Sequence, residues 1–355
     1  MPNVGEATRT PTVFAASVHD VRHLGSLLRG VNFVDFALMT ITSGGLTVFV
    51  EESSIIAVAA AYVPAQIFDE FTYNAPVSSP SASPTPPGLS QSEEPTVLEF
   101  PLRIFIDSLS IFSTGPAPSA VEGRAKTRRW VRDRDDGGED DVPRGRIEAY
   151  FPPVLGKTVG MRLSYAGEGH PLSLLVAEGS AEPDAKFEVT TYTADSQPDM
   201  SFDIEQTVLQ LILKSSWLRD ALSEIDPSCD KLTLIGNPPP AQDSPSRRPR
   251  ATASPPIFRI HAEGAFGSTE MDYPNDREVL ETVHCAEPVS FSYRVAHIAR
   301  AQRALQSSSK TSLRIGNDGT MNMQFLVPSP LVRGGTNEAF ISFRVKQLVH
   351  STSCS

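Results

Sequence analysis

The chain has 355 residues, of which 30 are proline, and its formal net charge is −11 at pH 7. Hydrophobic residues make up 40% of the chain, which suffices for folded cores and excludes an intrinsically disordered protein. The negative charge argues against a simple basic nucleic-acid-binding domain, although one local surface could still contact DNA.

Neither a membrane protein nor a secreted protein is expected. The longest apolar run, residues 55–63, is far shorter than the ~20 residues that a spanning helix needs. Glu6 and Asp20 interrupt the first 20 residues, which contain no apolar signal core. The cysteines are odd in number, lack metal-ligand spacing and favour a reducing compartment: Cys229, Cys285 and Cys354.

The chain opens with strand patterns around one short helix. Four runs rich in β-branched and aromatic residues are predicted strands: 14–18, 34–42, 46–50 and 55–63. A helix is predicted over residues 20–32, with Asp20 as its N-cap because a carboxylate can accept from the free amides of the first turn. Its apolar residues recur at helical spacing: Val21, Leu24, Leu27, Leu28 and Val31.

The remaining elements alternate in the same manner. Helices are predicted at residues 102–112, 217–225 and 295–305. Further strands are predicted at 161–165, 172–176, 187–193, 208–213, 232–235, 257–262, 268–273, 279–284, 312–315, 321–327 and 340–345.

Three proline-rich insertions, about 76–95, 116–153 and 237–256, interrupt this pattern. Two basic runs inside them, 124–134 and 247–250, are either nuclear-import or DNA-contact patches or plain solvated loop.

Each half has a strand, a short helix, several strands, a second short helix and more strands. This order predicts a duplicated α+β fold, with short helices on one side of mostly antiparallel sheets. The predicted domains are residues 12–198 and 199–350, followed by a tail at 351–355.

Several strings in family order carry a resemblance: VRHLGSLLRGVNFVDFALMTITSGGLTVFVEE, LRIFIDSLSIFSTGP, MRLSYAGEGHPLSLLVAEG, WLRDALSEID and FGSTEMDYP. The chain resembles the sliding clamps of the proliferating-cell-nuclear-antigen type, and within them the Rad-One subunits of the checkpoint clamp, the nine-one-one complex. The match covers most of residues 12–350 outside the insertions.

The resemblance implies a non-catalytic subunit of a heterotrimeric ring in the nucleus. Its expected partners are two related clamp subunits, double-stranded DNA bound non-specifically, a clamp loader, and checkpoint and repair proteins. It also implies that the helices line the hole and that the sheets form the outer shell. Exposed sheet edges, expected near residues 165–176 and in the second domain, would join the subunits.

The helix faces opposite the apolar stripes are the candidate DNA-facing surface, because lysine and arginine contact phosphates without reading sequence. The first and fourth helices place basic residues there, whereas the second mixes Arg103 with Asp107 and the third exposes Asp220 and Glu224. The candidate DNA-facing residues are Arg22, Arg29, Arg103, Lys214, Arg219, Arg300 and Arg303. The plain alternative is that these side chains only solvate amphipathic helices.

Two other functions stay open. A metal-dependent 3′–5′ exonuclease needs carboxylates that hold two metal ions about 3.5–4 Å apart, and most acidic residues lie singly or in the second insertion. The histidines are scattered, so no metal site or cofactor is predicted. A homotrimeric replication-type clamp would instead assemble from this chain alone.

Overall fold

The computed structural model describes residues 12–52, 57–75, 94–113, 159–178, 185–194, 201–239, 256–330 and 336–348. The tail at 351–355, both basic runs and nearly all of the three insertions lie outside these residues. None of the described helices is long and apolar enough to cross a membrane.

The first half begins with a strand and a capped helix. Asp20 caps the first helix, as predicted, by accepting a hydrogen bond from the backbone amide of Arg22. The elements are β1 (Phe14–Val18), α1 (Val21–Gly30), β2 (Phe36–Thr42), β3 (Gly45–Glu51), β4 (Ala57–Pro64), η1 (Ala65–Ile67), β5 (Glu70–Tyr73), β6 (Thr96–Pro101), α2 (Leu102–Ser113), β7 (Val159–Tyr165), β8 (Leu172–Glu178), β9 (Ala185–Val189) and β10 (Tyr192–Thr193).

The second half repeats this order. Its elements are β11 (Thr207–Lys214), α3 (Ser215–Glu224), β12 (Cys229–Gly236), β13 (Phe258–Gly264), β14 (Gly267–Tyr273), β15 (Leu280–Cys285), β16 (Val289–Arg294), α4 (Val295–Ala299), α5 (Gln302–Ser307), β17 (Lys310–Gly316), β18 (Met321–Pro330) and β19 (Thr336–Val345). Each half thus has one strand, a helix, five strands, a helical segment and three further strands, and β10 is added to the first. The predicted duplicated α+β fold is confirmed.

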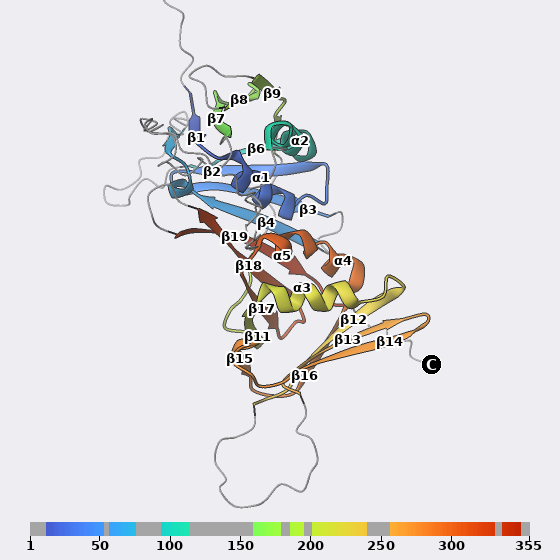
Figure 1. Ribbon diagram of the computed structural model, residues 1–355. Helices are drawn as coiled ribbons and strands as arrows, with labels where there is room; N and C mark the ends of the chain where they lie inside the picture. The colour runs from blue at the N-terminus through green and yellow to red at the C-terminus, as the bar shows by residue number, and fades with distance from the viewer. Residues whose placement is uncertain are drawn as a thin grey trace, which may run out of the picture.

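The sheets show the same duplication (Figure 1). In the first half one sheet has the order β5-β1-β7-β8-β9, and the second half contains the equivalent order β15-β11-β17-β18-β19. The other sheet, β6-β2-β3-β4, has its equivalent in β16-β12-β13-β14. Strands β4 and β19 pair antiparallel, so two of the four sheets merge into one of ten strands.

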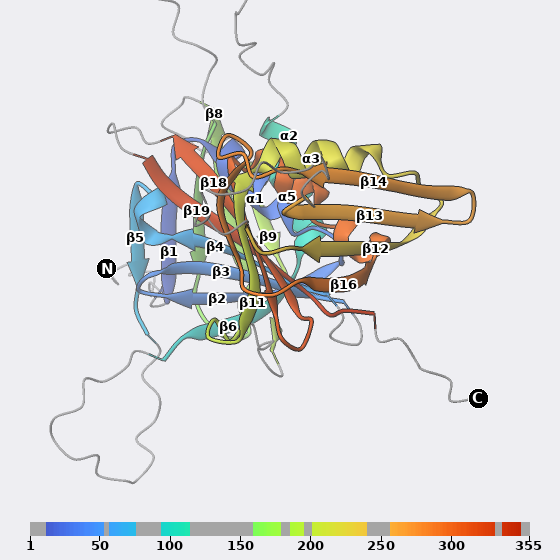
Figure 2. The same cartoon turned by 90° about the horizontal axis from the view of Figure 1, so that it is seen from below.

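Two matching strands have no pairing partner on their outer sides among the residues that the structure describes. β9 is the counterpart of β19 and ends the five-stranded sheet, whereas β14 is the counterpart of β4 and ends the four-stranded sheet. Figure 2 shows β14 at the outer side of its sheet. The edge predicted near residues 165–176 is wrong, because β7 and β8 each pair with a strand on both sides.

Three other predictions need correction. The helix predicted at 295–305 is two short helices, with Arg300 and Ala301 between them, and the amide of Ala301 bonds to the carbonyl of Ile298 in a tightened turn. The strand predicted at 187–193 is divided between β9 and β10, which belong to different sheets. Strands β5, β6 and β16 were not predicted.

One hydrophobic core runs through both halves. Val21, Leu24, Leu27 and Leu28 on α1 are all buried, which confirms the predicted apolar face. The inward side chains of the sheets complete the core, and burial of this kind is the main favourable contribution to folding.

Candidate functional site

The helices form one row that crosses the boundary between the halves. α1 packs against α2 on one side and α5 on the other, and α5 packs in turn against α3. Figure 1 shows this row running from α2 through α1 and α5 to α3. We call α2, α1, α5 and α3 the helix row, and its exposed side chains are the candidate DNA-facing surface.

Arg22 lies at the start of α1 beside the residue that caps the helix. Its Nε lies 2.9 Å from Asp20 Oδ1 and its Nη2 lies 2.7 Å from Asp20 Oδ2. Burial of the Asp20 carboxyl opposes ionisation, but the hydrogen bonds from Arg22 outweigh burial and lower the pKa of Asp20. The charge of Arg22 is therefore largely balanced by its neighbour.

Arg29 and Arg303 meet at the middle of the helix row. They line a surface hollow together with Ser26, Gln306 and Ser307. Nη2 of Arg29 donates to Ser110 Oγ of α2 at 3.1 Å, and Nη1 of Arg303 donates to the carbonyl of Asn32 at 3.1 Å. The structure thus brings together two of the predicted basic residues from different halves of the chain.

Arg300 has a different environment from the other arginines of the set. Its Nη2 lies 2.5 Å from Glu52 Oε1, its Nη1 donates to the carbonyl of Phe33 at 3.5 Å, and its guanidinium lies 5.3 Å from the Phe33 ring centroid. The side chains of Arg300 and Glu52 are 29% and 28% exposed. Arg300 therefore joins the two halves, and we do not propose it as a DNA contact.

The ends of the helix row are less basic. Arg103 on α2 is exposed, but Ile104 and Asp107 are exposed beside it. Lys214 is exposed just before α3, and Arg219 lies 3.4 Å from the carboxylate of Asp220. Glu224 is also exposed, so the free face of α3 is acidic, as its sequence indicated.

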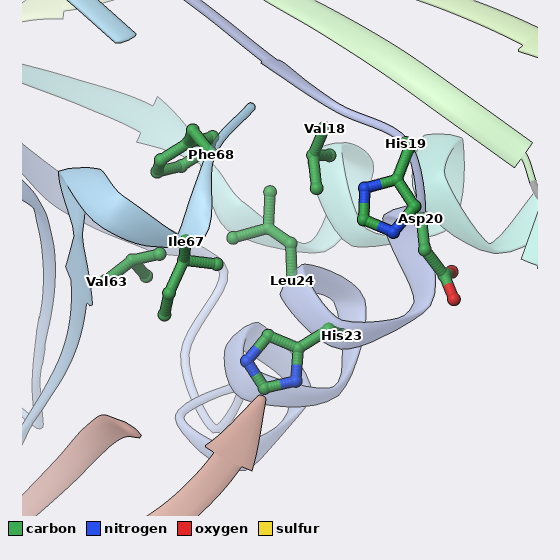
Figure 3. Close-up of a pocket in the computed structure, with 8 residues that line it drawn as sticks. All are labelled: Val18, His19, Asp20, His23, Leu24, Val63, Ile67 and Phe68. Atoms are coloured by element: carbon green, nitrogen blue, oxygen red, sulfur yellow. The ribbon is translucent and has the colours of Figure 1, made fainter. Parts of the chain in front are cut away.

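Two of the histidines lie at the start of α1. Figure 3 shows His19 and His23 at a small pocket with Leu24, Ile67 and Phe68. The Nδ1 atom of His19 lies 3.1 Å from Asp69 Oδ2, whereas burial lowers the pKa of His23. His19 therefore pairs with Asp69 at this pocket, and His23 is held partly buried there on α1.

No metal-binding constellation is visible in the part of the chain that the structure describes. There, no three His, Cys, Asp or Glu side chains lie close enough together to hold a metal ion. The acidic residues of the helix faces are divided between opposite ends of the row, with Asp107 on α2 and Asp220 and Glu224 on α3.

Sequence reasoning missed Glu52 and the carbonyls of Phe33 and Asn32 as partners of Arg300 and Arg303. No local pattern could have found them, because Glu52 and Arg300 are 248 positions apart.

This architecture is that of the sliding clamps. The chain is similar to a proliferating-cell-nuclear-antigen chain of the PCNA2–PCNA3 complex from Sulfolobus tokodaii, with a TM-score of 0.59 and 12% identity over 94% of this chain and 98% of that one. It is equally similar to PCNA from Thermococcus kodakaraensis, with a TM-score of 0.59, 13% identity and 94% and 100% coverage. At such identities the likeness establishes the fold alone.

The family follows from the sequence comparisons. The model of the family "Repair protein Rad1/Rec1/Rad17" matches residues 13–327, and the chain belongs to this family. The resemblance inferred from the sequence is thereby confirmed.

Several characterised relatives are similar over much of their length. "Cell cycle checkpoint protein RAD1" of Mus musculus is 26% identical over 312 residues, which is 88% of this chain and 85% of that protein. "DNA damage checkpoint control protein rad1" of Schizosaccharomyces pombe is 25% identical over 315 residues, or 89% and 81%. "DNA repair exonuclease REC1" of Mycosarcoma maydis is 31% identical over 229 residues, or 60% and 49%.

Proposed function

We propose that the chain is a non-catalytic subunit of a DNA damage checkpoint clamp, a heterotrimeric ring that encircles double-stranded DNA in the nucleus. A clamp loader places the ring, which then recruits checkpoint and repair proteins. Within the chain we propose that one clamp domain spans residues 12–198 and the other 199–350.

The observation that carries this proposal is the pair of unpaired strands, β9 and β14. Inside the chain their counterparts β19 and β4 pair with each other, from Phe340 opposite Tyr62 to Val345 opposite Ala57. An unpaired edge presents free amides and carbonyls that a partner's edge can extend. Head-to-tail repetition of the same pairing between subunits closes a ring of six such domains.

Light scattering of the purified chain, alone and co-expressed with the two related clamp subunits of the same genome, tests the assembly. We expect a monomer that becomes a one-to-one-to-one complex. A stable trimer of the chain alone would instead support the homotrimeric replication-type clamp. A chain that binds neither partner would contradict the ring.

The DNA contacts that we propose are Arg22, Arg29, Arg103, Lys214, Arg219 and Arg303. Non-specific phosphate contacts suit a sliding ring because each is weak and independent of sequence. The hollow lined by Arg29 and Arg303 brings two of these residues together from different halves of the chain.

Replacing Arg29 and Arg303 by glutamate should weaken binding of the assembled ring to duplex DNA. Each lost phosphate contact lowers the slope of log affinity against log salt by about 0.9, so we expect a change of roughly two units. Titrations at several salt concentrations measure it. Glutamates at Arg162 and Arg277, exposed on and beside the sheets, are the control and should leave the slope unchanged.

A second candidate function is metal-dependent exonuclease activity, which the name of the Mycosarcoma maydis relative favours. The chain covers about half of that relative's length. Digestion of DNA by the rigorously purified chain, dependent on added Mg²⁺ and abolished by Asp107→Asn or Asp220→Asn, would support it. Digestion that persists in both variants points to a contaminating nuclease.

A further inference from the structure

The contact between the two halves of the chain serves as a template for the contact that this chain would form with a neighbouring subunit. Besides the pairing of β4 with β19, the last residues of α1 face α5 closely. Gly30 is buried there, and a Cβ atom on it would lie 3.5 Å from the Cβ of Ala304. Ser26 lines the hollow with Arg303, and the carbonyl of Asn32 accepts from Arg303.

We call the end of the second half that carries the unpaired strand β14 its free end. There, α3 repeats the burial pattern of α1 with different side chains. α3 has ten residues, like α1, and their buried positions coincide at the first, fourth, seventh and eighth residues. Counted from the helix start, the counterparts of Ser26, Gly30 and Asn32 are Asp220, Glu224 and Asp226. In the first half these three positions face a neighbouring helix. At the free end of the second half the equivalent positions carry carboxylates, and all three are exposed.

Two of these carboxylates lie near the end of the unpaired strand. Figures 1 and 2 show α3 beside the sheet that β14 ends. Tyr273, the last residue of β14, has a raised pKa, first because it is buried and then because Glu224 and Asp220 repel its ionised form. We call β14 with Asp220, Glu224 and Asp226 the acidic end.

The opposite end of the chain does not complement this surface. α2 directly follows β6, just as α4 directly follows β16, so the residues after these two strands can be matched by position. The sixth residue is Asp107 after β6 and Arg300 after β16. The tenth residue is the exposed Ile111 in α2, where the second half has the buried Ala304. A second copy of this chain would therefore set the bulky Ile111 against Glu224, where the joint inside the chain sets Ala304 against Gly30. Ser110, the ninth residue after β6, takes the place of Arg303, so it would offer Asp220 a hydroxyl group in place of a basic side chain. A carboxylate left unpaired at an interface is costly.

We propose that the acidic end binds a different clamp subunit, whose sheet edge pairs with β14 and whose adjoining helix presents lysine or arginine to Asp220 and Glu224. The same charges exclude a second copy of this chain, so they select a mixed ring over a homotrimer. This inference rests on the proposed function, because it assigns one joint of the same ring.

Reversing the charge of the acidic end tests this assignment. In Asp220→Lys with Glu224→Lys we expect the affinity for one of the two partner subunits to fall about tenfold or more, because rim and buried charge pairs both contribute to such joints. Binding to the other partner, through β9, should be unchanged. Glu278→Lys with Glu338→Lys changes the net charge equally, on exposed residues of the turn before β15 and of β19, and should leave both affinities unchanged.

Sedimentation of each pair of full-length subunits at 50 and 300 mM salt provides the readout. In the wild type, higher salt should weaken only the joint at the acidic end. In the charge-reversed variant higher salt should instead strengthen this joint, because it screens the repulsion between like charges. A wild-type three-subunit complex whose affinities are unaffected by the reversal would overturn the acidic-end assignment and leave the ring intact. A wild-type chain that binds neither partner would overturn the ring itself.

Discussion

Replacing Gly30 by alanine should lower the free energy of unfolding by about 1–3 kcal/mol, the range for overpacking a tightly packed site. The new Cβ would come within 2.5 Å of Ile341 Cδ1 and 3.4 Å of the Cα of Ala304. Ile341 is fully buried on β19, so it cannot turn away freely, and the backbone of α5 cannot yield without loosening the contact between the halves.

Gly25→Ala in the same helix is the matched control. Its Cβ would meet only the end of Arg29, at 3.6 Å, which is an ordinary contact. Because glycine costs roughly 0.5–1 kcal/mol relative to alanine inside a helix, this variant should be slightly more stable than the wild type. Urea unfolding of both variants measures the difference. Equal effects of the same sign would show that α1 and α5 do not pack as closely as described.

Replacing Arg300 by alanine should cost about 1–3 kcal/mol of unfolding free energy. Removing one member of a fully buried ion pair typically costs about 3–5 kcal/mol, and the roughly 30% exposure of this pair reduces the effect. The variant leaves the Glu52 carboxylate without the guanidinium and the Phe33 ring without the cation above it.

A double-mutant cycle with Glu52→Gln separates the pair from the rest of the Arg300 contacts. We expect a coupling free energy of about 1 kcal/mol or more between the two changes, and faster hydrogen exchange in α4 and α5 for each variant. Arg303→Ala, which loses one hydrogen bond at an exposed position, should cost less than Arg300→Ala. Strictly additive effects at Arg300 and Glu52 would contradict their role in joining the halves.

The elements with a strong local signal could be predicted from the sequence. β1 was predicted with its observed bounds, and Asp20 with its apolar periodicity defined α1. β6 was missed because it follows Pro95 and ends at Pro101, where composition favours a loop, and its pairing with β2 determines its structure. β16, with the sequence VSFSYR, is half polar and pairs with β12. Such strands depend on a partner that is distant in sequence.

The candidate site was predictable only as a set of helix faces. Helical spacing placed Arg29, Arg300 and Arg303 opposite the apolar stripes, but it gave no information about what would face them. Arg300 proved to meet Glu52, and Arg29 proved to meet Ser110 on another helix. The acidic free face of α3, which was evident from its sequence, became interpretable only through the equivalent positions of α1.

The strand that joins the halves has a consequence for biosynthesis. β19 is made after every other described strand, yet it pairs with β4 of the first half as well as with β18. Until the ribosome has added residues 336–345, both β4 and β18 present an open edge, which is a template for pairing with other chains. A nascent chain therefore passes through its most aggregation-prone stage just before this strand emerges. A message truncated shortly before it would yield a product that lacks the centre of its largest sheet.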